Sequence, residues 1–269
     1  MQAAVLVLED SPHFNAGHGA ALNENGVHEL DAAIMDGATL AAGAVCAARH
    51  VRNPVLAARA LLEAGDPLLL AGPAADRYAE AKGLAVVPQA YFTTERRRRA
   101  LAAMKAHAAA GSEATENEKH GTVGAVALDS HGHLAAATST GGYNNKPDGR
   151  VGDIPIIGAG TYARDGVCAV SGTGKGEFFI RHLVGKEIAA RIAYLGEDLA
   201  TAAAKVVMED LKPYRIGAGL VAVSARGEIA APYNTDGMFR GWVTDEGRFR
   251  VASHAEVFDY EPEGTAATG

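Results

Sequence analysis

The chain has 269 residues, a formal net charge of −7 and an aromatic content of only 6%. The length is enough for one large domain with its own core. The acidic balance argues against binding to phosphate backbones, and the scarcity of aromatics argues against a stacking platform for single-stranded nucleic acid. Two cysteines in apolar surroundings, Cys46 and Cys168, fit a reducing compartment, so we expect a cytoplasmic protein.

The first half of the chain alternates between strand and helix patterns. Its N-terminus is typical of the end of an amphipathic helix. The expected elements that follow are strands at 29–36 and 40–48, a helix from Asn53-Pro54 to Gly65, a short apolar run at 68–70, and helices over 73–82 and 91–110. We interpret the basic run Arg96–Arg99 as the solvated face of the last helix.

A change of composition at Gly111 divides the chain. The polar stretch GSEATENEKHG lacks periodicity and indicates an exposed linker, which we place at 107–121. An apolar, β-rich run, TVGAVALD, begins at once after it, and a second strand, LAAATST, follows a turn. A buried strand that starts directly after an exposed linker is the main organisational feature of the sequence.

The second half again groups strands and helices into blocks. The expected elements are strands at 154–160 (IPIIGAG) and 167–173 (VCAVSGT), helices between 177 and 212, a hairpin at 217–234, a strand at 239–243 and a disordered tail at 261–269. Blocks of this kind favour sheet layers with helices outside them rather than a βαβ alternation.

The junction between Gly121 and Thr122 could carry chemistry. A threonine hydroxyl is a weak nucleophile and needs a base within hydrogen-bond reach. If Thr122 is the first residue of its chain, its own α-amine, with a pKa of about 7.7–8.0, can serve as that base. The chain must then be cut before Thr122, and Gly121 permits backbone conformations that other residues avoid.

Several motifs, in the same order, resemble the plant-type asparaginases, also called isoaspartyl or β-aspartyl peptidases. They are FNAGHGAALN, HELDAAIMDG, GAVCAARHVRNPVLAARALLE, HGTVGAVALD, ATSTGG, GRVGD, SGTGKGE and NTDGMFRGW. The resemblance implies an α+β fold, a four-layer αββα sandwich of the N-terminal-nucleophile hydrolase type. It also implies a single-domain precursor, 1–269, cut into an α subunit (1–121) and a β subunit (122–269), which assemble as a dimer of heterodimers.

The same resemblance implies an activity and its site. The reaction is release of aspartate from L-asparagine and from isoaspartyl dipeptides, without a catalytic cofactor. The implied catalytic residues are Thr122 as nucleophile, Thr140 beside its amine, Asn15 nearby, and Thr173 with Gly174 as the oxyanion hole. Arg150, Asp153, Gly174 and Gly176 would bind the substrate. Backbone carbonyls of Leu8, Glu9, Ser11, Phe14, Ala16 and His18 would hold a structural sodium ion.

Two alternatives remain open at this point. Glycosylasparaginases share the fold but typically have Asp before the threonine, whereas this chain has Gly121. The family also normally opens with a strand that carries Gly-Gly-Ala and then a helix, and both are missing before Met1. We expect a fragment or a misassigned start, and the other reading is an inactive, truncated paralogue.

Two other motifs imitate a phosphate-binding loop and a metal site, but the sequence supports neither. GTGKGE at 172–177 imitates a phosphate loop, but Gly176 follows the lysine where that motif needs Ser or Thr. His131 and His133 flank a glycine without a third ligand nearby, which favours a solvated turn over a metal site.

Overall fold

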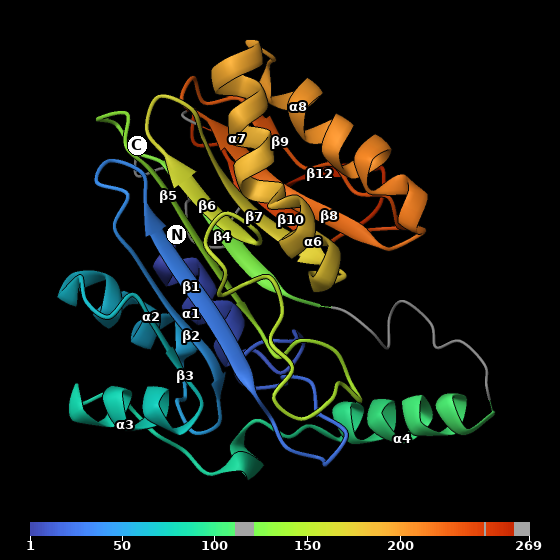
Figure 1. Ribbon diagram of the computed structural model, residues 1–269. Coiled ribbons are helices and arrows are strands. Elements are labelled where there is room, and N and C mark those ends of the chain that lie inside the picture. Colours follow the sequence, from blue (N-terminus) through green and yellow to red (C-terminus); the bar gives the residue numbers. More distant parts are fainter. Residues whose placement is uncertain (111–120, 245, 261–269) are drawn as a thin grey trace, which may run out of the picture.

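The computed structural model describes residues 1–110, 121–244 and 246–260, and it forms four layers (Figure 1). The outer layer on one side contains α1 (Gln2–Asp10), α2 (Pro54–Ala64) and α3 (Pro73–Ala81). The outer layer on the other side contains α6 (Gly176–His182), α7 (Val184–Leu195) and α8 (Leu199–Lys205). Helix α4 (Glu95–Ala110) lies at one end of the molecule.

Two sheets lie between these helices. The first has the order β3-β2-β1-β5-β4, and its strands are β1 (Leu30–Asp36), β2 (Ala42–Ala48), β3 (Leu69–Ala71), β4 (Val123–Leu128) and β5 (Leu134–Thr140). The second has the order β6-β7-β8-β9, with β6 (Thr161–Arg164), β7 (Cys168–Gly174), β8 (Ala218–Ser224) and β9 (Ile229–Ala230). Strands β4 and β5 of the first sheet pack on β7 of the second. The expected αββα sandwich is therefore confirmed.

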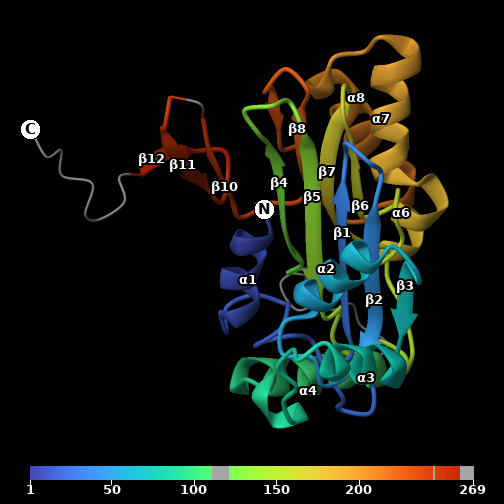
Figure 2. The same ribbon diagram turned by 90° about the vertical axis from the view of Figure 1, so that its left-hand side faces the viewer.

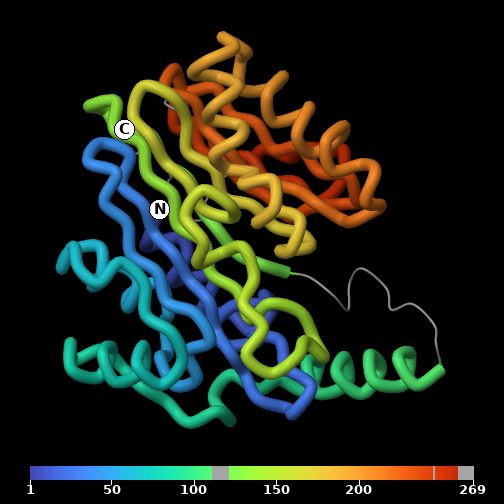
Figure 3. Tube along the Cα trace, in the orientation of Figure 1, coloured from blue at the N-terminus to red at the C-terminus, as the bar shows by residue number. Residues whose placement is uncertain are grey.

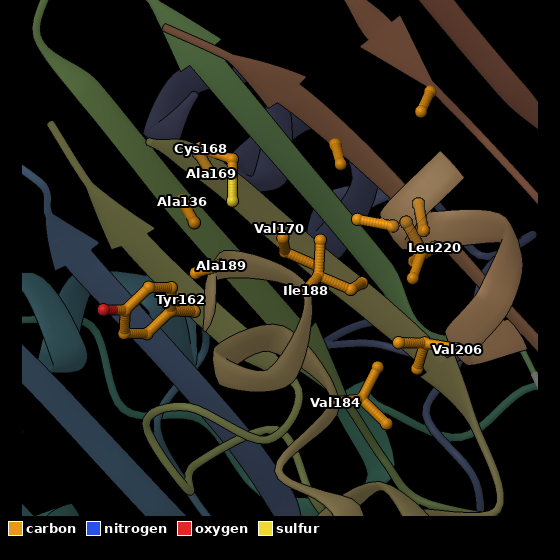
Figure 4. Packing of buried hydrophobic residues seen from close by; sticks show 14 of the residues in the cluster. Ala136, Tyr162, Cys168, Ala169, Val170, Val184, Ile188, Ala189, Val206 and Leu220 are labelled. Atoms are coloured by element: carbon orange, nitrogen blue, oxygen red, sulfur yellow. The ribbon is translucent and has the colours of Figure 1, made fainter. Parts of the chain in front are cut away.

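Apolar side chains fill the space between each sheet and its helices. One cluster lies against the second sheet, where Val170 and Leu220 of the strands meet Ile188 and Val206 of the helical layer (Figure 4). The other lies between the first sheet and α1 and α2, and includes Val5, Ile34 and Val55. Consecutive side chains of β1 and β2 are buried, because this sheet is covered on both faces.

A third, three-stranded sheet stands away from the sandwich (Figure 2). It consists of β10 (Arg240–Val243), β11 (Phe249–Ala252) and β12 (Val257–Tyr260). The sequence predicted only the first of these strands. Short 3₁₀ turns at Gln89–Tyr91 and Lys212–Tyr214 and a π-helical turn at Val206–Asp210 complete the described elements. Within the described ranges, no helix is long and apolar enough to cross a membrane.

Four expectations from the sequence were wrong. Residues 154–160 form a turn rather than a strand, because the Asp153 carbonyl accepts the N–H groups of both Ile156 and Gly160. Helix α4 ends at residue 110, as predicted, but it begins at Glu95 rather than at residue 91, and it includes the first residues of the linker placed at 107–121. Residues 111–120 lie outside the described ranges together with the predicted tail, 261–269. Strand β4 lies at the edge of its sheet and is only partly buried beyond Val123, although the sequence predicted a buried strand. In the basic run of α4, Arg97 is buried, whereas the other three arginines are exposed.

The start of α2 also differs from the expected cap. Asn53 occupies the N-cap position but its side chain makes no capping hydrogen bond. Instead, the Glu9 carboxylate at the end of α1 accepts the N–H of Val55 at 3.0 Å. A side chain from another helix can satisfy the free N–H groups at a helix start as well as a local cap does.

Candidate active site

Thr122 and Thr140 lie opposite each other where β4 begins and β5 ends. The antiparallel register pairs Val123 with Ser139, so the residues one step further along each strand face one another. Their hydroxyl oxygens are 3.0 Å apart. The Thr140 hydroxyl also accepts the N–H of Gly142 at 3.0 Å, which leaves its proton free to point at Thr122. The register of one strand pair therefore brings together the predicted nucleophile and its predicted neighbour.

Asn15 connects the chain segments that carry these threonines. Its backbone N–H donates to the carbonyl of Gly121 at 2.9 Å, and its carbonyl accepts the N–H of Gly141 at 3.0 Å. Its side-chain amide donates to the carbonyl of Gly142 at 2.5 Å and accepts the N–H of Ala21 at 2.6 Å. Asn15 is fully buried and all these groups are satisfied. It touches the residues beside Thr122 and Thr140, and so fixes the separation of the two strands.

Thr173 and Thr122 line one cavity between the two sheets. This cavity has a volume of about 70 Å³, and its lining also includes Val123, Gly124, Ser171, Gly172, Leu220, Val221, Met238 and Phe239. The Thr173 hydroxyl makes no hydrogen bond to any other residue in the described part of the chain. It is therefore available to a ligand next to Thr122, as an oxyanion donor must be.

Ser171, Met238 and Phe239 were not singled out from the sequence as site residues. Met238 and Phe239 lie in the motif NTDGMFRGW, which contributes to the family resemblance but for which the sequence predicted no role. Phe239 is 83% exposed, so it forms the outer rim of the cavity. A sequence pattern alone cannot show that a large apolar side chain is exposed beside Thr122.

Arg150, Asp153 and Gly176 form the second part of the site. A Cβ atom on Gly176 would lie 2.8 Å from Nη2 of Arg150 and 2.9 Å from Oδ1 of Asp153. Because both contacts are shorter than a Cβ tolerates, a side chain at position 176 would displace the guanidinium or the carboxylate. The predicted cation, anion and glycine are thus brought together, as a recognition site for an amino acid's carboxylate and ammonium requires.

Glu177 and Tyr143 complete this part of the site, and sequence reasoning missed both. Nε and Nη2 of Arg150 donate to the two carboxylate oxygens of Glu177 at 3.0 and 3.1 Å. The guanidinium also lies over the Tyr143 ring, 4.7 Å from its centroid. One edge and one face of the Arg150 guanidinium are therefore engaged by the protein, and the Nη1 end remains for a ligand. Glu177 directly follows Gly176, so its place in the motif SGTGKGE was the available signal.

Asp153 is the least solvated carboxylate of the site. It is 5% exposed, and its Oδ2 atom has no hydrogen-bond partner in the structure. Burial raises the pKa of Asp153 to about 7, and the nearby Arg150 charge opposes this shift only in part. A buried, unpaired carboxylate oxygen costs free energy that a ligand's ammonium group would recover.

Gly142 joins the two parts of the site. Its N–H donates to the Thr140 hydroxyl, and a Cβ on it would lie 3.3 Å from Nη1 of Arg150. Gly142 therefore contacts the Thr140 hydroxyl and also lies beside the Nη1 end of the guanidinium. On the other side, Gly174 and Gly176 flank a single residue, Lys175, so the Thr173 end of β7 runs directly into the Gly176 end of α6.

The residues predicted to hold sodium occupy a different place. Leu8 and Glu9 end α1, and the other four belong to the loop that follows and that also contains Asn15. A larger cavity of about 390 Å³ lies between α4 and residues 22–26, and none of the predicted site residues lines it. The pair His131 and His133 is exposed on a turn, as predicted, and His133 pairs with Asp165.

The fold and the paired hydroxyls define a class of protein. A four-layer αββα sandwich with a threonine directly before a sheet strand is the architecture of the N-terminal-nucleophile hydrolases. The sequence profile of the family described as asparaginase matches residues 1–253. The chain therefore belongs to the asparaginase family.

Curated relatives agree with this assignment. The isoaspartyl peptidase of Escherichia coli (strain K12) is 49% identical over 244 residues, which cover 89% of this chain and 76% of the relative. The isoaspartyl peptidase of Salmonella typhimurium is 50% identical over 89% of this chain and 78% of the relative. The isoaspartyl peptidase/L-asparaginase of Mus musculus is 43% identical over 88% of this chain and 72% of the relative.

Proposed function

We propose that this chain cuts itself between Gly121 and Thr122, and that the new N-terminal threonine releases aspartate from L-asparagine and from isoaspartyl dipeptides. The observation that carries the proposal is the 3.0 Å contact between the Thr122 and Thr140 hydroxyls at the edge of a cavity that Thr173 also lines. The names of the relatives, isoaspartyl peptidase and L-asparaginase, supply the substrate class.

The substrate is an aspartyl unit with a free α-carboxylate and a free α-amine. The Nη1 end of Arg150 takes the carboxylate, because Nε and Nη2 are already paired with Glu177. Asp153 takes the ammonium, because its Oδ2 atom has no hydrogen-bond partner among the described residues. The Gly176 carbonyl adds an acceptor for the ammonium. These contacts place the side-chain carbonyl of the aspartyl unit at the hydroxyl of Thr122, so orientation is supplied before the bond is attacked.

The α-amine of Thr122 accepts the hydroxyl proton while Oγ1 bonds to the side-chain carbonyl carbon. Negative charge develops on the carbonyl oxygen, and the Thr173 hydroxyl and the Gly174 N–H donate to it. The C–N bond then breaks, ammonia or an amino acid leaves with the proton, and an ester joins Thr122 to the aspartyl unit. Water adds to this ester, releases aspartate and restores the hydroxyl.

The sodium ion implied by the resemblance has a suitable loop. The carbonyl oxygens of Ser11, Phe14, Ala16 and His18 accept no hydrogen bond from the described residues, whereas those of Leu8 and Glu9 accept the N–H groups of Ser11 and His18. Free carbonyl oxygens in one short loop suit a hard cation. An ion there would tie the end of α1 to the loop that contains Asn15.

Two further features of the sequence analysis are kept as proposals. The cleaved halves assemble as a dimer of heterodimers, in line with the resemblance. The compartment is cytoplasmic, in keeping with two cysteines that are both free and buried.

The test compares wild type, Thr122→Ala and Thr122→Ser with the exposed helical variant Thr201→Ala as control. In wild type and control we expect two bands on a denaturing gel, with masses that match residues 1–121 and 122–269. The same two bands should appear more slowly in Thr122→Ser, and Thr122→Ala should show only the uncut chain. Aspartate release from asparagine and from a β-aspartyl dipeptide should follow the same order. An uncut, inactive wild type would instead support the truncated paralogue, and turnover of a glycosylated asparagine alone would support the glycosylasparaginase alternative.

A further inference from the structure

Arg97 is a buried cation that pairs with no carboxylate of residues 1–110, 121–244 or 246–260. It is only 3% exposed, although Arg96, Arg98 and Arg99 on the same helix are exposed. Its Nε donates to the backbone carbonyl of Gly19, and none of its nitrogens pairs with an acidic side chain in the described part of the chain. Burial lowers the pKa of Arg97 to about 10, so the guanidinium is still charged at neutral pH. Removing an unpaired charge from water costs free energy, so the burial of Arg97 needs a compensating role.

The buried guanidinium lies at the junction between Gly121 and Thr122. A Cβ atom on Gly121 would lie 3.7 Å from Nη2 of Arg97 and 3.0 Å from the Cβ of Asn15. The Gly121 carbonyl, which belongs to the bond that is cut, accepts the backbone N–H of Asn15 at 2.9 Å. With a φ of +144°, Gly121 has a backbone conformation that L side chains rarely adopt. One N–H donor and one positive charge therefore lie beside the scissile peptide.

We propose that Arg97 assists self-cleavage by stabilising the negative charge that develops on the Gly121 carbonyl oxygen, alongside the Asn15 N–H. The proposal rests on the self-cleavage proposed above. It assigns a role to a residue that the proposed hydrolysis of aspartyl substrates does not use, because Arg97 does not line the cavity that Thr122 shares with Thr173.

Oγ1 of Thr122 bonds to the Gly121 carbonyl carbon, and the π electron pair moves onto the oxygen, where Arg97 and the Asn15 N–H stabilise it. The carbon–nitrogen bond then breaks, and the proton lost by the hydroxyl ends on the departing nitrogen, which becomes the α-amine of Thr122. Water cleaves the resulting ester, returns the hydroxyl and leaves a carboxylate on Gly121. The product thus gives the buried guanidinium the negative partner that it lacks before cleavage.

The role depends on charge rather than on shape, which separates it from a structural role. An oxyanion donor is worth about 10²–10³ in rate, and a cation in a site shielded from water acts through the same kind of preorganised electrostatics. Lysine keeps the charge but loses the fork, whereas Gln and Met keep the bulk and lose the charge. If Arg97 acted only by holding the Gly19 carbonyl, the cleavage rate of each variant would follow its stability and not its charge.

The experiment measures the first-order rate of chain cleavage in purified, full-length protein by denaturing gel and intact mass. The variants are Arg97→Lys, Arg97→Gln and Arg97→Met, and Arg98→Gln is the matched control from the same helix. Melting temperatures and elution volumes show which variants are folded. Aspartate release is divided by the amount of cleaved chain, so that hydrolysis is followed independently of cleavage.

We expect Arg97→Gln and Arg97→Met to cut about 100-fold more slowly than wild type, a loss of the size seen for one oxyanion donor. Arg97→Lys should retain at least a tenth of the wild-type rate, Arg98→Gln should match wild type, and hydrolysis per cleaved chain should stay within about threefold throughout. Equal cleavage rates in Arg97→Met and wild type would overturn the inference, as would equal rates in the Lys and Met variants or a parallel loss of hydrolysis per cleaved chain. If wild type itself stays uncut, the proposed function fails instead.

Discussion

Asp153 combines burial, an unpartnered oxygen and a position beside Arg150, and this combination predicts a pH-dependent affinity. Only the ionised carboxylate can hold a substrate ammonium, and the pKa of Asp153 is about 7 in the free protein. Below pH 7 we therefore expect the affinity for the product L-aspartate to fall by up to about tenfold per pH unit.

Isothermal titration of cleaved protein with L-aspartate between pH 5.5 and 8 would measure this dependence. Asp153→Asn should bind weakly at every pH, and its affinity should vary much less. An affinity that stays constant across this range in the wild type would contradict the assignment. The exposed variant Asp148→Asn, from the same loop, controls for the general loss of one negative charge.

The same carboxyl group affects the free energy of unfolding with a defined sign. Its pKa is higher in the folded protein, about 7, than the usual value of 3.8, so its contribution to stability is fully present below pH 4 and is lost as the pH rises towards 7. Without ligand, wild type should lose on the order of 1 kcal/mol per pH unit from this group between pH 5 and 7. Urea unfolding should show this loss reduced in Asp153→Asn, and identical pH slopes in the two proteins would refute it.

At the scale of elements, the close approach of β4 to β7 depends on Gly124. A Cβ on Gly124 would lie 1.9 Å from Oγ and 2.9 Å from Cβ of Ser171. Ser171 cannot easily turn away, because its hydroxyl is hydrogen-bonded to that of Thr138 at 2.8 Å inside the sandwich. The two sheets meet at this point directly beside the cavity that Thr122 lines. The residue at position 124 therefore determines how closely β4, which follows Thr122, packs on β7, which contains Thr173.

Gly124→Ala should destabilise the fold by about 2 kcal/mol, within the range observed for overpacked cores. Ser171→Gly removes both short contacts, so the double variant should be more stable than the sum of the two single changes predicts. Urea unfolding in the uncut Thr122→Ala background, where a single chain unfolds, would measure this coupling. If the changes in unfolding free energy of the two single variants simply add in the double variant, the contact between positions 124 and 171 does not constrain the distance between the sheets.

At the scale of the whole molecule, the proposed cut does not divide the fold. Strand β1 belongs to residues 1–121 and β5 to residues 122–269, yet they pair from Asp31↔Thr140 to Asp36↔Ala135. Figure 3 shows the green strands β4 and β5 running beside the blue strands of the first sheet. One apolar cluster also combines Val5 and Ile34 from the first segment with Val123 and Ala137 from the second.

The two fragments should therefore remain together after cleavage. On a sizing column in native buffer we expect both to elute in one peak at the volume of the uncut Thr122→Ala protein, and to separate only in denaturant. Elution of residues 122–269 alone in native buffer would contradict the shared sheet. Thr122→Ala is the matched control because it differs from wild type only at the proposed nucleophile.

Much of this arrangement was predictable from the sequence. The hydrophobic patterns located β1, β2, β5 and β7 almost to the residue, because strands buried on both faces are continuous apolar runs. The ordered set of motifs predicted the family and the pairing of Thr122 with Thr140. Residues 154–160 were wrongly predicted as a strand. They are an apolar run with the composition of a strand, but two hydrogen bonds to the Asp153 carbonyl hold them in a turn.

What the sequence determined by itself is the class of fold, the family and the residue types of the site, since these follow from local patterns and motif order. Only the tertiary structure decided that Glu177 holds Arg150, that Met238 and Phe239 border the cavity, and that Arg97 is buried beside Gly121. Each of these depends on contacts between segments far apart in the chain. A basic run on a helix has the same pattern whether all its members are solvated or one is buried, because burial is set by the neighbouring segments and not by the helix.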